Sequence, residues 1–202
     1  MLYFILKLVA YIIFKIFFNI KVFGRNYLPK DGGVIIASNH LSYLDPIVLG
    51  VASWRRLNFM AKKELFDNRA FSLLIKSLGA FPLERENSRG LTQAIKEALT
   101  RLRQGKVLVI FPEGSRSPSG KIQKALGGVG LIAYKANCPV VPALIKGTDE
   151  ALPYKAKFVH LFKPISVHFG RAIRPGNTDK KESYQIFADR VMEEIVKLDR
   201  SI

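Results

Sequence analysis

A histidine and an aspartate stand five positions apart in the segment SNHLSYLD, over residues 38–45. On a continuous helix, His40 and Asp45 would point about 140° apart and could not touch. If the segment is a loop, the carboxylate can fix the imidazole tautomer and leave the other ring nitrogen as a general base. Ser42 lies too close along the chain to be a natural nucleophile, so the nucleophile would be a substrate hydroxyl or a water molecule.

Both residues also have an ordinary structural interpretation. Asp45 directly precedes Pro46, an order that is typical of a helix N-cap followed by proline in the first helical turn. His40 would then be a solvent-exposed loop histidine without a chemical task. The pair alone does not separate a capping aspartate from a catalytic one, so the other polar segments of the chain have to decide.

A second polar segment, FPEGSRSPSG over residues 111–120, follows the apolar run KVLVI. Its glycines, serines and arginine can offer backbone N–H groups, hydroxyls and a guanidinium to an anion. The spacing of its glycines and lysine excludes a nucleotide-binding P-loop. Lys62, Lys63 and Arg85 each follow another apolar run, where they either add positive charge to the same site or are simply solvated.

The elements that must position these residues are short apolar runs that alternate with helical patterns. Continuous apolar strands of this kind predict an α/β fold with a mixed, largely parallel sheet covered by helices. Ligands of such folds bind at the carboxyl ends of the strands, so we expect the polar segments to converge on one rim. Strands are predicted over residues 33–38, 56–61, 80–83, 106–111, 139–145 and 164–170, with the clearest helices over 88–104 and 180–200.

The first 24 residues are predicted to form a membrane-anchoring helix, and residues 25–202 the α/β domain. Lys7, Lys15, Asn19 and Lys21 fall within one arc of about 160°, and the opposite face is wholly apolar. This pattern favours a helix that lies in the membrane interface with its lysines at the headgroups. Phenylalanines within the lysine arc leave a membrane-spanning helix as the alternative.

The composition favours anionic partners. The chain has 202 residues with 32 basic and 16 acidic side chains, a net charge of +16. An acidic membrane surface, an acidic carrier protein or a nucleic acid would suit this charge, but no nucleic-acid-binding motif is present. The single cysteine, Cys138, excludes an intrachain disulfide and fits a reducing compartment. No spacing typical of a metal site occurs.

Four sequence blocks resemble those of the glycerolipid acyltransferases, specifically the 1-acyl-sn-glycerol-3-phosphate acyltransferases. NHLSYLD resembles their N-H-x4-D block, and GAFPLER, FPEGSRS and VVPALI resemble the three blocks that follow it, in order, between residues 39 and 145. AKKEL resembles the lysine-bearing segment between the first two. Ser115 stands where threonine is more common, which keeps the hydroxyl.

The resemblance implies a reaction and a place for each substrate. His40 would deprotonate the sn-2 hydroxyl of a lysophosphatidic acid, which would attack the thioester of an acyl carrier protein or coenzyme A, while Asp45 would orient the imidazole. Apolar surface near Pro142 would accommodate acyl chains, and neither a metal nor a cofactor is implied. The phosphate of the acceptor would bind among Lys62, Arg85, Glu113, Gly114, Ser115 and Arg116.

Three alternatives stay open at this point. An acyltransferase of the same fold could use glycerol 3-phosphate or another lysolipid as its acceptor. A hydrolase could use water in place of the lipid hydroxyl. A non-catalytic basic protein could simply bind membranes. For the acyltransferase we expect a place on the cytoplasmic face of the cell membrane, held on one side of the bilayer by the first helix.

Overall fold

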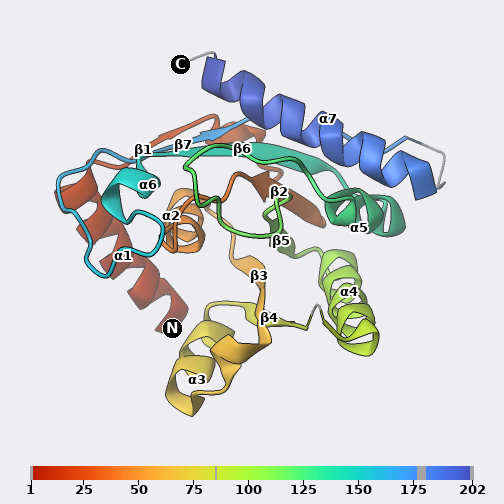
Figure 1. Cartoon of the computed structure of the whole chain (residues 1–202), viewed down its shortest axis with the longest axis horizontal. Coiled ribbons are helices and arrows are strands. Elements are labelled where there is room, and N and C mark those ends of the chain that lie inside the picture. Colours follow the sequence, from red (N-terminus) through yellow and green to blue (C-terminus); the bar gives the residue numbers. More distant parts are fainter. Residues whose placement is uncertain (1, 85, 177–180, 201–202) are drawn as a thin grey trace.

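The computed structural model describes residues 2–84, 86–176 and 181–200, which form one mixed sheet with helices on both faces (Figure 1). The order of the strands across the sheet is β1-β7-β6-β2-β5-β3-β4. The strands are β1 (Lys21–Phe23), β2 (Val34–Ser38), β3 (Leu57–Lys62), β4 (Ala80–Leu83), β5 (Val107–Ile110), β6 (Val140–Lys146) and β7 (Ser166–Phe169).

Two apolar cores lie on the two faces of the sheet. Side chains alternate along a strand, so Val34 and Ile36 enter the core beneath α1 and α2, whereas Ile35 and Ala37 enter the core beneath α4, α5 and α7. Figure 1 shows these two groups of helices on opposite sides of the sheet. The helices are α1 (Leu2–Phe18), α2 (Asp45–Ala52), α3 (Arg69–Ser77), α4 (Ser88–Arg103), α5 (Gly128–Ala136), α6 (Thr148–Ala151) and α7 (Lys181–Arg200), with the 3-10 turns η1 (Arg25–Tyr27) and η2 (Lys63–Phe66).

Five neighbouring strands run in the same direction. β6, β2, β5, β3 and β4 pair in parallel, while β7 is antiparallel to β6 and β1 is parallel to β7. The predicted mixed, largely parallel sheet is therefore confirmed. The carboxyl ends of the five parallel strands meet at one edge, and the loops that begin after β2, β3 and β5 leave the sheet there.

The N-terminal segment differs from the predicted helix over residues 1–24. Helix α1 ends at Phe18, and residues 21–23 form the edge strand β1, paired with β7. Asn19 has a φ of 43°, a left-handed conformation that asparagine tolerates better than most residues and that ends the helix. The β-branched Ile20 and Val22 that follow favour an extended chain. The end of the predicted anchor is therefore a strand of the sheet.

Helix α1 packs on the domain through the face that carries the predicted lysine arc. Phe14 and Phe18 of that arc are buried in the core, and the ammonium group of Lys7 donates a hydrogen bond to the carbonyl of Ser53 at the end of α2. Burial, with a smaller contribution from Arg25, lowers the pKa of Lys7. Most of the apolar face is turned outward, together with Phe4 and Lys15 of the lysine arc, whereas Ile20 is buried. None of the helices in the described part of the chain is long and apolar enough to cross a membrane.

Candidate active site

The loop that carries His40 begins where the side chain of Asn39 prolongs the pairing of β2 with β6. Its Nδ2 donates to the carbonyl of Ile145 at 2.9 Å, and its Oδ1 accepts from the N–H of Ile145 at 2.8 Å. The amide thus imitates one further backbone step after the strand ends at Ser38. Because Asn39 is buried, this pair of bonds fixes the point at which the chain turns toward His40.

His40 and Asp45 meet, as the loop interpretation predicts. Oδ2 of Asp45 lies 2.9 Å from Nδ1 of His40 and also accepts from the N–H groups of Leu41 and Ser42, each at 2.8 Å. A carboxylate only accepts hydrogen bonds, so Nδ1 carries the proton and Nε2 keeps a lone pair. Asp45 is fully buried, and its charge lies directly behind the imidazole. A general base oriented by a carboxylate requires this arrangement.

The capping interpretation of Asp45 is wrong. Helix α2 begins at Asp45, its N-cap position is Leu44, and no side chain caps it. The carboxylate instead accepts from N–H groups upstream in the His40 loop. Pro46 does lie in the first turn, as predicted, because its fixed φ suits that place and its missing N–H is not needed there.

The ring of His40 lies flat against Phe111, which directly follows β5. The two ring centroids are 3.9 Å apart, and the planes differ by 15°. Since Asp45 holds one edge of the imidazole and Phe111 covers one face, the ring has little freedom to turn. The side chain of His40 nevertheless stays 17% exposed, so a substrate can reach it.

Glu113 holds the loop of His40 and is not turned toward solvent. Its Oε1 accepts from the backbone N–H of His40 at 2.7 Å, and its Oε2 from that of Gln123 at 3.0 Å. Burial raises the pKa of Glu113, and these two N–H donors partly offset the effect. From the other side, the N–H of Ser117 donates to the carbonyl of His40 at 2.9 Å. The segment after β5 therefore forms hydrogen bonds with both the backbone N–H and the carbonyl of His40.

Arg116 lies beside two tyrosines. Its guanidinium carbon is 3.4 Å from the ring centroid of Tyr43 and 5.1 Å from that of Tyr154. Such contacts hold a guanidinium in place without neutralising it. Among the described residues, no acidic side chain forms an ion pair with Arg116, so its charge is available to an anion. Neither tyrosine was singled out from the sequence, and Tyr154 comes from a loop far along the chain.

The other predicted site residues are placed less centrally. Lys62 ends β3 at the same edge of the sheet and is exposed, while the N–H of Gly114 already donates to the carbonyl of Phe111 at 3.0 Å. Ser115 is exposed in the same turn. Pro142 lies within β6, opposite Ala37, and is buried, so the structure does not bring it to the rim. Arg85 lies outside the described residues.

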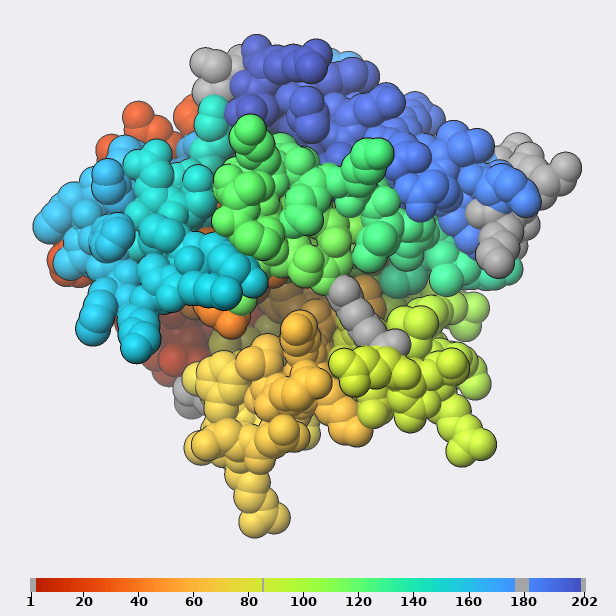
Figure 2. All heavy atoms as spheres, in the orientation of Figure 1, coloured from red at the N-terminus to blue at the C-terminus, as the bar shows by residue number. Residues whose placement is uncertain are grey.

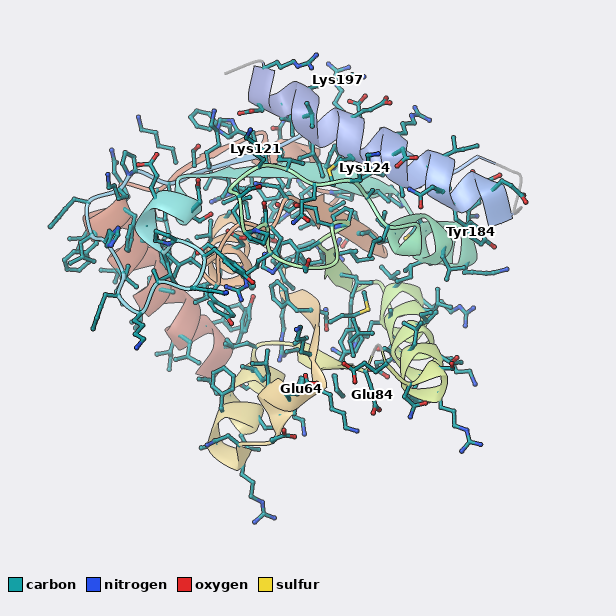
Figure 3. The ribbon with its side chains drawn as sticks, in the orientation of Figure 1. Glu64, Glu84, Lys121, Lys124, Tyr184 and Lys197 are labelled. Atoms are coloured by element: carbon teal, nitrogen blue, oxygen red, sulfur yellow. The ribbon has the colours of Figure 1, made fainter. Side chains whose placement is uncertain are left out.

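The molecular surface is hollowed beside these loops. Figure 2 shows a depression between the yellow segment of η2 and α3 and the green and cyan segments above it, with the orange segment after β2 visible at its edge. An ion pair joins η2 to the residue after β4, where Nζ of Lys63 lies 3.1 Å from Oε1 of Glu84. Figure 3 places Glu84 there, beside β4.

The mixed, largely parallel sheet agrees with comparisons to known proteins. The family model described as Acyltransferase matches residues 19–146, more than half of the chain. The chain belongs to the acyltransferase family.

Within this family, the chain is similar to proteins of one particular name. The chain is 31% identical over 197 residues to the 1-acyl-sn-glycerol-3-phosphate acyltransferase of Streptococcus pneumoniae, covering 95% of this chain and 70% of that protein. It is 35% identical over 133 residues to the protein of the same name from Bacillus subtilis, covering 65% of each. The chain thus spans about two thirds of the length of these relatives.

A solved structure is similar over most of the chain. The crystal structure of the 1-acyl-sn-glycerophosphate (LPA) acyltransferase PlsC from Thermotoga maritima aligns with a TM-score of 0.70 and 25% identity, covering 89% of this chain and 71% of that one. The predicted family and the predicted fold class are confirmed by these comparisons.

Proposed function

We propose that the protein transfers a fatty acyl group from a thioester to the sn-2 hydroxyl of lysophosphatidic acid and so forms phosphatidic acid. The observation that carries the proposal is the contact between His40 Nδ1 and Asp45 Oδ2, held in a loop that the segment after β5 grips. The names of the relatives from Streptococcus pneumoniae and Bacillus subtilis support the same acceptor.

The proposed reaction uses His40 as base and then as acid. Nε2 takes the proton of the lipid hydroxyl as its oxygen attacks the thioester carbonyl, and Asp45 stabilises the imidazolium that forms. Collapse of the tetrahedral intermediate breaks the C–S bond, and the imidazolium returns the proton to the leaving thiolate. Ser42 does not compete as nucleophile, because it is buried and its hydroxyl donates to the carbonyl of Leu152 at 2.8 Å.

The phosphate of the acceptor is proposed to bind at Arg116. A guanidinium held by Tyr43 and Tyr154 presents a planar, two-pronged donor that matches phosphate oxygens. Lys62, exposed at the end of β3, adds positive charge on the same edge of the sheet. The sequence resemblance adds Arg85 to this group.

We further propose that the enzyme sits on one side of the membrane, on the cytoplasmic face, through the outward face of α1. Large apolar side chains stand exposed along this helix, and an apolar surface of this size is rarely left in water. The exposed residues are Phe4, Ile5, Leu8, Val9, Tyr11, Ile12, Ile13 and Ile16. Apolar side chains of Leu65, Phe71, Leu73 and Leu74 are exposed across the hollow, at η2 and α3. A lipid acceptor could then reach His40 from the bilayer.

The donor is proposed to be an acyl thioester of acyl carrier protein or coenzyme A, both of which carry negative charge. The net charge of +16 favours either. Figure 3 places Lys121 and Lys124 on the loop between β5 and α5, on the same side of the molecule as Lys197 of α7. Both lysines of the loop are exposed.

The decisive test uses purified protein, a labelled acyl thioester and a panel of acceptors. Lysophosphatidic acid should be converted to phosphatidic acid faster than glycerol 3-phosphate or a lysolipid without a free phosphate. Faster conversion of glycerol 3-phosphate would establish the related acyltransferase instead. Release of free fatty acid without acceptor would indicate a hydrolase, and no reaction with any acceptor would leave only a membrane-binding role.

A further inference from the structure

The loop between α6 and β7 exposes an unusual amount of apolar surface. Phe158 is 78% exposed and Phe162 is 73% exposed, and Val159 and Leu161 between them are also exposed. Figure 2 shows this cyan-to-blue segment protruding from the left edge of the molecule. Scattered apolar residues on a surface need no explanation, but four within five positions form a patch that suits an apolar partner.

Two backbone hydrogen bonds hold this loop in shape. The N–H of His160 donates to the carbonyl of Ala151 at 2.7 Å, and the N–H of Phe162 donates to that of Phe17 in α1 at 2.8 Å. Lys155 and Phe162 have backbone φ values of 64° and 63°, which residues other than glycine rarely adopt. The bonds therefore hold the chain in a turn that keeps its apolar side chains outward.

The patch continues onto the outward face of α1. The ring of Phe162 meets that of Phe17, with centroids 6.0 Å apart, and the exposed Ile13 lies about one turn before Phe17 in α1. Figure 1 shows the loop running alongside α1. An apolar partner that covers α1 therefore also reaches the loop.

The charges of the loop favour an anionic surface around that apolar partner. Residues 152–163 contain no acidic residue and three lysines, Lys155, Lys157 and Lys163, of which Lys163 lies 3.5 Å from Oε2 of Glu150 just before the loop. Lysines beside exposed phenylalanines are the pattern of a segment whose apolar tips enter acyl chains while its ammonium groups stay at anionic headgroups.

The same loop also reaches the candidate active site. The carbonyl of Leu152 accepts from the hydroxyl of Ser42, two residues from His40. Two residues further on, Tyr154 lies against the guanidinium of Arg116. A single short segment therefore contacts both the active-site loop after β2 and the proposed phosphate ligand, while its tip projects from the molecule.

We propose that the loop over residues 152–163 is a second lipid-contacting element, which places Phe158 and Phe162 among the acyl chains of an anionic bilayer beside α1. This proposal rests on the membrane placement in the proposed function. Contact at two elements fixes the tilt of the domain on the bilayer, which one helix alone does not. It sets the height of Arg116 above the lipid surface, because Tyr154 belongs to the inserted loop.

The test uses single tryptophan reporters on vesicles of phosphatidylglycerol and phosphatidylethanolamine. The chain has one tryptophan, Trp54, so a Trp54→Phe background allows Phe158→Trp, Ile12→Trp on α1 and Ile186→Trp on α7 to be compared. Ile186 is 69% exposed and is the matched control on the opposite helical layer. Vesicles should shift the emission of the reporters at 158 and 12 to the blue, and lipids brominated in their acyl chains should quench both. The reporter at 186 should not respond.

The outcomes separate this inference from the proposed function. Quenching at position 12 without quenching at position 158 overturns the second lipid contact and leaves the membrane placement of α1 intact. Quenching at position 158 alone supports the membrane contact of the loop and overturns the proposed membrane contact of α1. Quenching at neither position removes the membrane placement and this inference with it, while the acyl-transfer assay in detergent still decides the chemistry.

A second pair of variants measures how much the loop contributes to binding of the protein to vesicles. Phe158→Ser should weaken binding to the vesicles about tenfold or more, since it withdraws an apolar side chain from the lipid, and Ile186→Ser should not. With a short-chain, fully dissolved lysophosphatidic acid, Phe158→Ser should keep the wild-type rate. Unchanged vesicle binding of a folded Phe158→Ser variant would overturn the proposal.

Discussion

The backbone N–H of His40 donates to Oε1 of Glu113 across 2.7 Å, so the loop after β2 is held by the segment after β5. The second oxygen of the same carboxylate accepts from the N–H of Gln123, and both partners are main-chain groups. Position 113 therefore needs a side chain with two acceptor oxygens and no donor. Aspartate would be one methylene too short to keep both bonds, and glutamine offers only one oxygen.

Replacing Glu113 by glutamine should change how stability depends on pH. Burial raises the pKa of Glu113 above its ordinary value of 4.5, so the folded state binds this proton more readily than the unfolded state does. The contribution of Glu113 to the free energy of unfolding is therefore present at low pH and falls as the pH rises through its raised pKa. Thermal unfolding of both proteins from about pH 4 to about pH 7 should show this slope in the wild type only.

The same variant should also lose activity. One of the two N–H groups is left facing an amide NH2, which costs roughly 1–3 kcal/mol and loosens either His40 or Gln123. Glu193→Gln, on the exposed side of α7, controls for the loss of one charge. Suppose that Glu113→Gln keeps wild-type activity and the wild-type dependence of unfolding on pH. The two hydrogen bonds of Glu113 to the N–H groups of His40 and Gln123 would then be dispensable.

Removing the imidazole of His40 should abolish acyl transfer without unfolding the protein. Loss of a general base costs roughly 10²- to 10⁴-fold in rate. The carboxylate of Asp45 keeps its two backbone donors in His40→Ala, so the fold should survive, as circular dichroism and thermal unfolding can verify. His160→Ala, which removes an exposed imidazole elsewhere, is the matched control in detergent. A folded His40→Ala enzyme with near wild-type turnover would falsify the mechanism.

Asp45→Asn should keep most of the stability and lose most of the activity. The amide oxygen can still accept from the N–H groups of Leu41 and Ser42, but the negative charge behind the imidazole is gone. Rate should fall by roughly 10²-fold or more. Asp45→Ala should unfold at a lower temperature, because the buried N–H groups of Leu41 and Ser42 and the ring of His40 lose their acceptor.

The nitrogen resonances of His40 show whether the charge of Asp45 matters or only its hydrogen bond. The proton should reside on Nδ1 in the wild type and in Asp45→Asn alike, because a single side-chain oxygen accepts from Nδ1 and from the N–H groups of Leu41 and Ser42. An active Asp45→Asn variant with the wild-type tautomer would mean that Asp45 only shapes the loop.

Cys138 should be chemically silent in the folded protein. Burial raises the pKa of its thiol to about 12, so almost no thiolate exists at neutral pH. A thiol reagent at mildly alkaline pH should label Cys138 only at the rate of local or global unfolding, and at once in denaturant. An added cysteine at the exposed position Ser88 provides the fast-reacting control. Rapid stoichiometric labelling of the native wild-type protein would contradict the burial.

Most of the sheet and the meeting of His40 with Asp45 could be predicted from the sequence. Apolar runs predict six of the seven strands in the described part of the chain, and the direction rule for parallel strands brings the polar segments to one edge. The sequence does not predict strand β1. Its three residues, 21–23, continue the apolar pattern of the preceding helix, and no glycine or proline marks a break between them. Only Asn19, in a left-handed conformation, and Ile20 separate the two elements.

Other features depend on packing that one sequence does not encode locally. The sequence predicts the lysine arc of α1 at lipid headgroups, but Lys7 lies against the protein with Phe14 and Phe18 of the same arc. Burial of two aromatic rings outweighs partial burial of one ammonium group. Tyr154 gave no signal, because its loop has no periodic pattern and meets Arg116 only in the folded chain. Asn39 did offer a signal, as an amide placed directly after a buried strand.

Arg116 provides the sharpest test of where the acceptor phosphate binds. A guanidinium held over Tyr43 and Tyr154 can meet two phosphate oxygens at once, and an ammonium group cannot reproduce that geometry. Arg116→Lys should therefore raise the KM for lysophosphatidic acid, and Arg116→Ala should raise it by about 10- to 100-fold, the equivalent of one charged hydrogen bond or more. Steady-state kinetics with each substrate varied in turn measure both effects.

The effect of Arg116 should be confined to the acceptor. The KM for the acyl thioester should stay nearly constant, and a lysolipid without a free phosphate should be almost indifferent to Arg116→Ala. Arg190→Ala, which removes an exposed guanidinium from α7, controls for the loss of one positive charge from a strongly basic protein. If Arg116→Ala instead raises the KM of the thioester and leaves that of lysophosphatidic acid unchanged, the guanidinium serves the donor, and the phosphate must bind elsewhere on the rim.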